Sequence, residues 1–222
     1  MKKIITIILT FVFCVGCNYS TYSKQEDTKT LLKKDNISSS MADSPINTRN
    51  LDEYLFIEGV NYVDVRPYEW IINDGYVAGF RFIPFYELIA KNASAANFDN
   101  ILFSYNYSKT PDGQEIRGGD VGSFSPIYQE SIQIIKQLFP SDEPILFISQ
   151  SGVESGYIIN LLIQLGYDGK NLYNVGGFSN SDGIYSAYKK LVNPNPKYFI
   201  QGNPYIDIEI DLSLSEELTK IP

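Results

Sequence analysis

Short apolar runs alternate with longer helix-like stretches from Leu51 onward, and this alternation limits the possible folds more than any other feature of the chain. Apolar runs of this length suit buried strands. Strands that alternate with helices are typical of a mostly parallel sheet. We therefore predict an α/β domain over residues 51–222, with helices on both faces of a central sheet. The expected strands cover residues 62–65, 101–105, 145–148 and 172–175.

Two stretches between these runs have helical periodicity. The apolar positions of 125–139 fall largely on one face, and Ser125 with Pro126 forms a start signal for a helix over that range. A second helix is expected over 156–165, because Gly166 stands at the usual position of a C-terminal cap.

A turn signal and an alternating tail complete the pattern. Residues 109–113 read Lys-Thr-Pro-Asp-Gly, a strong turn sequence, so we predict a hairpin-like insertion near 92–124. Residues 206–212 alternate Ile or Leu with Asp or Glu, which predicts a half-buried strand. Their carboxylates would point to solvent, so a metal site is not expected there.

Two compositional absences exclude whole classes of chemistry. The chain contains no histidine, and its only cysteines are Cys14 and Cys17. A Ser-His-Asp or Cys-His arrangement, a zinc site of Cys and His ligands, and a thiol nucleophile in the folded region are therefore excluded. We expect no metal and no cofactor. The net charge of −8, without a basic cluster, argues against nucleic-acid binding.

The N-terminus has the organisation of an export signal. Lys2 and Lys3 precede an apolar run over 4–13, which is too short for a membrane span. The run ends in Gly16-Cys17, which resembles the lipobox of bacterial lipoproteins. The resemblance implies a signal peptide over 1–16, lipid on Cys17, and a membrane-anchored protein in the extracytoplasmic cell envelope. A plain cleaved signal and an uncleaved anchor remain alternatives.

Residues 17–50 follow the signal and are rich in Ser, Thr, Asn, Lys and Asp, with little apolar periodicity. This composition is typical of a flexible linker. We predict that 17–50 is a lipid-anchored flexible tether that holds the domain off the membrane.

Two distant parts of the chain carry a family resemblance. Residues 62–69 read Tyr-Val-Asp-Val-Arg-Pro-Tyr-Glu, and they are followed by Gly-Tyr-Val-Ala-Gly at 75–79 and Phe-Ile-Pro-Phe-Tyr-Glu-Leu at 82–88. Residues 145–155 read Ile-Leu-Phe-Ile-Ser-Gln-Ser-Gly-Val-Glu-Ser, and Leu-Tyr-Asn-Val-Gly-Gly-Phe follows at 172–178. In order and spacing, these segments resemble the rhodanese family, with Tyr76 in place of the family's histidine. The resemblance implies a rhodanese-like α/β fold; a generic α/β domain is the alternative.

The family transfers sulfur through a cysteine at a strand end, on a loop whose N–H groups and arginine favour an anion. By the resemblance, Ser149 occupies the cysteine position and Glu154 that of the arginine. A serine hydroxyl cannot carry a persulfide, and without histidine no conventional base activates it. A carboxylate at Glu154 would also repel an incoming anion.

The candidate site therefore consists of a degenerate catalytic position, Ser149, and a loop whose backbone N–H groups could still hold a small anion. Asp64 and Arg66 are expected to support it, the aspartate by accepting backbone N–H groups and the arginine by pairing with an acid. A purely structural turn is the alternative. The candidate ligand-binding loop is Gln150, Ser151, Gly152, Val153, Glu154 and Ser155.

The functional hypothesis is a catalytically inactive rhodanese-like module that acts by binding. Its partner is the membrane through the lipid, together with an unidentified small anion or protein. The alternative is an enzyme, either a sulfurtransferase or a hydrolase that uses the Ser149 loop.

Overall fold

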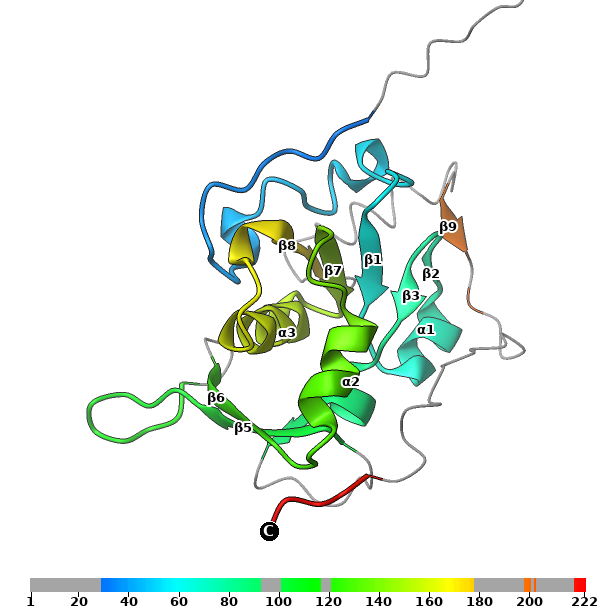
Figure 1. Ribbon diagram of the computed structural model, residues 1–222. Helices are drawn as coiled ribbons and strands as arrows, with labels where there is room; N and C mark the ends of the chain where they lie inside the picture. Colours follow the sequence, from blue (N-terminus) through cyan, green and yellow to red (C-terminus); the bar gives the residue numbers. More distant parts are fainter. Residues whose placement is uncertain (1–28, 93–100, 117–120, 178–197, 201, 203–217) are drawn as a thin grey trace, which may run out of the picture.

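A mostly parallel four-stranded sheet forms the centre of the protein (Figure 1). The computed structural model describes residues 29–92, 101–116, 121–177, 198–200, 202 and 218–222. The strand order is β3-β1-β7-β8, and all three pairings are parallel. The predicted α/β class with a mostly parallel sheet is confirmed. The strands are β1 (Asn61–Asp64), β3 (Arg81–Phe82), β7 (Ile145–Ser149) and β8 (Leu172–Gly177).

Alternate residues of these strands face two separate hydrophobic clusters, as the two-residue period of a strand requires. On one face, Phe147 and Leu172 pack with residues of α2 (Ser131–Leu138) and α3 (Val153–Gln164). On the other face, Leu146 and Val175 belong to a second cluster. The buried residues that the N-terminal part and the β2 region add to this second cluster are Ile46, Leu51, Leu55, Val77 and Phe80.

Helices on both faces were predicted, and the second face differs from this expectation. None of the described residues in its cluster comes from α1 (Tyr68–Asp74), α2 or α3. The cover is instead an irregular N-terminal segment with the short 3-10 helix η2 (Leu51–Glu53).

A second sheet with the order β4-β5-β6 lies in the region near 92–124 where the insertion was predicted. Strands β5 (Phe103–Tyr107) and β6 (Val121–Pro126) are antiparallel, and β4 (Ala90–Asn92) pairs with β5 in parallel. The predicted turn is confirmed, because the Gly113 N–H donates to the Thr110 carbonyl at 2.8 Å. Residues 93–100 and 117–120 of the insertion lie outside the described part.

The sequence prediction of a helix over 125–139 placed the start of the helix too early. Its first residues belong to β6, and α2 begins only at Ser131. Phe124 is buried between the exposed Ser123 and Ser125, so this stretch follows the period of a strand and not that of a helix. The second predicted helix is confirmed as α3, and Gly166 follows its end with a φ of 92°.

The remaining described elements are short. A π-helical turn, η3 (Phe85–Ile89), follows the Ile-Pro sequence, and two 3-10 helices are η1 (Met41–Asp43) and η4 (Gly169–Asn171). Strand β2 (Tyr76–Val77) pairs with β9 (Phe199–Ile200) in antiparallel fashion. The predicted strand over 206–212 lies outside the described residues. In the described part of the chain, no helix has the length and apolar character needed to cross a bilayer.

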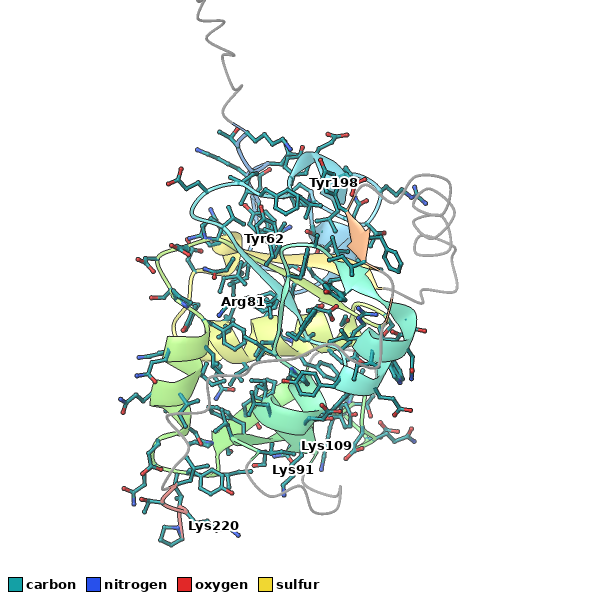
Figure 2. All side chains as sticks on the ribbon, turned by 90° about the vertical axis from the view of Figure 1, so that its right-hand side faces the viewer. Tyr62, Arg81, Lys91, Lys109, Tyr198 and Lys220 are labelled. Carbon is teal, nitrogen blue, oxygen red and sulfur yellow. The ribbon has the colours of Figure 1, made fainter. Side chains whose placement is uncertain are left out.

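Figure 2 shows the two ends of the molecule. Tyr62 and Tyr198 lie near the N-terminal segment at one end, and Lys91, Lys109 and Lys220 lie at the opposite end. Lys91 belongs to β4 of the second sheet, and Lys109 follows β5. The second sheet and the described N-terminal residues therefore occupy opposite ends of the central sheet.

Residues 29–50, here called the N-terminal strap, run along the outside of the domain past β8 (Figure 1). The prediction of a flexible tether over 17–50 is wrong for these residues, because Lys34, Ile46 and Thr48 are at most 4% exposed. The folded domain therefore begins no later than the strap, and not at Leu51. Residues 17–28 lie outside the described part.

Lys34 explains why a polar segment packs so closely. Its ammonium group donates to the carbonyls of Gly169 at 3.1 Å and Leu172 at 2.9 Å, and also to that of Ser38. Burial lowers the pKa of Lys34 to about 8, although the charges of Asp43 and Asp168 raise it. Hydrogen bonds from a buried polar side chain thus hold the strap on the domain. A search for apolar periodicity in the sequence does not detect such contacts.

Candidate functional site

Ser149 is the last residue of β7, and a short loop leads from it into α3. Gly152 ends this loop with a φ of 85°, a left-handed conformation that favours glycine. A Cβ atom there would lie 3.2 Å from the Met41 sulfur and 3.3 Å from the Gly176 Cα. The local sequence Ser-Gly-Val therefore serves both the turn and the close approach of the strap.

The Ser149 side chain is turned into the protein and is 0% exposed. Its hydroxyl oxygen accepts a hydrogen bond from the Gly152 N–H at 2.8 Å. One N–H donor of the predicted anion cradle is therefore engaged by the serine itself. The hydroxyl therefore has no solvent-exposed surface in this structure.

Asp64 and Arg66 form a buried ion pair at the end of β1, and both side chains are 0% exposed. The closest approach is 2.6 Å, between Arg66 Nη2 and Asp64 Oδ2, and Nη2 also donates to the Gly75 carbonyl at 2.8 Å. Asp64 additionally accepts the Arg66 backbone N–H at 3.0 Å. The expected roles of these two residues agree with this geometry. Their charges compensate each other inside the fold.

Glu154 lies in the first turn of α3, close to a cluster of tyrosines. Burial raises the pKa of Tyr86, and the charge of Glu154 raises it further. The buried Oε2 atom of Glu154 has no hydrogen-bond partner within the described residues, and the same holds for the Ser155 hydroxyl. The carboxylate thus supplies negative charge where the resemblance places a positive charge.

Asn174, in the middle of β8, joins the strap to the loop. Its Nδ2 atom donates to the Ser39 carbonyl at 2.9 Å and to the Gly152 carbonyl at 2.8 Å. Its Oδ1 atom accepts the Gly176 N–H at 3.1 Å. Sequence reasoning missed this residue. A lone amide within the buried strand sequence Leu-Tyr-Asn-Val was the available signal, because buried polar groups require partners.

A pocket of about 560 Å³ lies between the strap and α3. From the predicted loop, only Ser151, Gly152 and Val153 line it. Residues 37–41 of the strap form the opposite wall. Ser149, Gln150, Glu154 and Ser155 are not among its lining residues. The structure therefore divides the predicted site into a buried part around Ser149 and an accessible part around Ser151.

The site offers no evident place for a metal ion in the described residues, where no three His, Cys, Asp or Glu side chains come together. The accessible groups are hydroxyls, amides and backbone atoms. These groups can donate and accept hydrogen bonds.

Comparisons of the chain with protein-family models, with curated proteins and with solved structures found no match. The rhodanese resemblance therefore rests on the sequence motifs of this chain.

Proposed function

We propose that the protein is a lipid-anchored envelope protein whose rhodanese-like domain is catalytically silent and acts by binding. The observation that carries the proposal is the state of Ser149, which is fully buried and hydrogen-bonded to the Gly152 N–H at 2.8 Å. A position that serves catalysis must present its reacting atom to substrate. Here the hydroxyl instead stabilises the turn into α3.

Several features support the rhodanese-like part of the proposal. A parallel strand ends at Ser149, a tight loop with a left-handed glycine follows, and a helix begins at Val153. The Asp64–Arg66 pair lies at the end of the adjacent strand β1. This order of strand, loop and helix supports the proposal.

The chemistry of the loop disfavours the enzymatic alternative. Glu154 adds negative charge near the start of α3, which weakens the attraction of the helix N-terminus for an anion. The chain also has no histidine that could act as a base. Binding therefore remains the function that the accessible groups of this site suit best.

A sulfurtransferase assay tests the proposal. The assay should use the full chain, because residues 29–50 pack on the domain. We expect thiosulfate and cyanide to yield no thiocyanate above the level of a Ser149→Ala control. Turnover by the native chain beyond that control contradicts the proposal.

The variants Ser149→Cys and Ser149→Cys/Glu154→Arg extend the same assay. We expect both to remain silent, because the side chain at this position is buried. If only these variants are active, the native chain is still catalytically silent, but the activity shows that substrate reaches position 149.

The anchoring part of the proposal has a separate test. Replacing Cys17 with Ala should release the protein from the membrane fraction, because the acyl chains attach to its sulfur. Retention of the variant in the membrane fraction contradicts lipid anchoring at Cys17.

A further inference from the structure

The pocket between the strap and α3 has the dimensions of a small-molecule site. Its volume of about 560 Å³ lies within the usual range of roughly 300 to 1,000 Å³ for ligand pockets. One wall is Ile37–Met41 of the strap, and the other includes Val153, Gly156 and Ile163 of α3. The pocket lies beside the loop but apart from the buried Ser149.

The lining is uncharged. Among the described residues that form it, none is Asp, Glu, Lys or Arg. The polar residues of the lining are Ser38, Ser39, Ser40, Ser151, Asn160 and Asn174, of which Asn174 already donates its amide N–H groups to the carbonyls of Ser39 and Gly152. Moving a charged ligand from water into such a site costs free energy that no opposite charge offsets.

Apolar side chains share the pocket with these polar groups. Ile37 and Met41 contribute from the strap, and Val153 and Ile163 from α3. Ligand sites usually combine an apolar lining with a few polar groups that orient the ligand. The mixture therefore suits a molecule that has both an apolar part and hydrogen-bonding groups.

Both walls are held in place without a ligand. Asn174 connects Ser39 of the strap to Gly152 of the loop. Lys34 fastens the beginning of the strap to Gly169 and Leu172. A preformed site of this kind avoids part of the ordering cost of binding.

We infer that this pocket binds an uncharged small molecule that carries hydroxyl or amide groups beside an apolar part. The inference rests on the proposed binding function and names its ligand class. It replaces the small anion expected at the loop, because the Gly152 N–H is engaged by Ser149 and the lining offers no cation.

A disulfide-capture experiment tests the inference. The full chain with Cys14→Ser and Cys17→Ser contains no other thiol, so Ser151→Cys supplies a single cysteine at the pocket. The protein is incubated with neutral, anionic and cationic fragments, each linked through a disulfide to cysteamine. The Cys thiolate attacks the disulfide, forms a mixed disulfide with the fragment and releases cysteamine. Intact-protein mass spectrometry reads the product.

A matched control is Ser141→Cys in the same background, because Ser141 is exposed and lies outside the pocket. We expect neutral fragments with hydroxyl or amide groups to be captured about tenfold more at position 151 than at 141, whereas charged fragments show no such preference. Equal capture of neutral fragments at both positions overturns the inference. Preferred capture of anionic fragments at 151 also overturns it.

These outcomes are separate from the test of the proposed function. Turnover of thiosulfate by the native chain would contradict catalytic silence whatever fragments are captured. Failed capture in a chain without turnover would instead remove this pocket as the binding site.

Discussion

The loop after β7 and the N-terminal strap meet at Gly152 and Asn174, but they are built on different principles. The loop joins a buried strand to a largely buried apolar helix, and apolar residues on both sides determine its path. The strap contains little regular structure and is held both by polar side chains that hydrogen-bond to backbone carbonyls and by Ile46 in the second hydrophobic cluster. The comparison shows that a segment of polar composition can pack on a fold through buried polar side chains.

The largest expected effect comes from the residue that fastens the strap. Replacing Lys34 with Met leaves the buried carbonyls of Gly169 and Leu172 without their donor. We expect the free energy of unfolding to fall by about 3 kcal/mol, because unsatisfied buried groups cost roughly 1–3 kcal/mol each. Urea denaturation measures the loss.

Lys33→Met is the matched control, because Lys33 is the exposed neighbour of Lys34. Its stability should stay within about 0.5 kcal/mol of the native value. If Lys34→Met and Lys33→Met lose the same free energy of unfolding, the strap contributes no more to stability than an ordinary linker.

Asn174→Ala tests the junction between strap and loop. The variant loses two donated bonds and the bond from the Gly176 N–H, so we expect a loss of about 2 kcal/mol. Limited proteolysis should then cut the strap faster. Asn106→Ala, at an exposed position of β5, is the control. An unchanged cleavage rate in Asn174→Ala would contradict the role of Asn174 in holding the strap to the loop.

The pH dependence of stability reports on Lys34 itself. Its pKa is lowered to about 8 in the folded protein, so above that pH the unfolded chain binds more protons than the folded one. The stability advantage of the native chain over Lys34→Met should therefore grow, by up to about 2 kcal/mol, between about pH 8 and about pH 9.5. Denaturation of both proteins across this range measures the difference.

Buried tyrosines act in the opposite direction at higher pH. Burial raises the pKa values of Tyr62 and Tyr173, so both lower the stability as the unfolded chain ionises above about pH 10. Tyr62 acts alike in both proteins, and its effect cancels in the difference. A difference that shrinks between pH 8 and 9.5 would contradict a buried, readily deprotonated Lys34.

Replacing either of two glycines next to the pocket with alanine should have the smallest effects on the free energy of unfolding, and the two effects should have opposite signs. A Cβ at Gly156 would make only ordinary contacts, with the Ser39 carbonyl oxygen at 3.5 Å, so Gly156→Ala should stabilise α3 by about 0.5–1 kcal/mol. Gly152→Ala should destabilise by about 1–2 kcal/mol, because its φ is 85° and Met41 lies close. Thermal unfolding measures both, and equal signs would contradict the described geometry.

Much of the central fold could be predicted from the sequence. Each of the runs at 62–65, 145–148 and 172–175 overlaps a strand of the main sheet, because a strand buried on both faces reads as a continuous apolar segment. The stretch before α2 was mistaken for helix, since Phe124 is a lone buried residue among serines and gives little periodic signal.

The site was predictable only in part. The strand end at Ser149, the turn at Gly152 and the Asp64–Arg66 pair follow from motifs that are local in sequence. Lys34 and Asn174 were not found, because the partners that tie the strap to the domain, Gly169 and Leu172 for Lys34 and Ser39 and Gly152 for Asn174, lie more than twenty residues away and hydrogen-bonding capacity leaves no periodic pattern. Nothing in the composition of the strap distinguishes it from a solvated linker.

The most direct test of the account compares thiol reactivity at the buried and accessible parts of the site. In the chain with Cys14→Ser and Cys17→Ser, single cysteines are placed at 149 and at 151, and labelling by Ellman's reagent is timed. Because Ser149 is 0% exposed and Ser151 is exposed, we predict labelling at 149 to be slower by about 100-fold or more. Equal or faster labelling at 149 would show an open, reactive position and contradict the account.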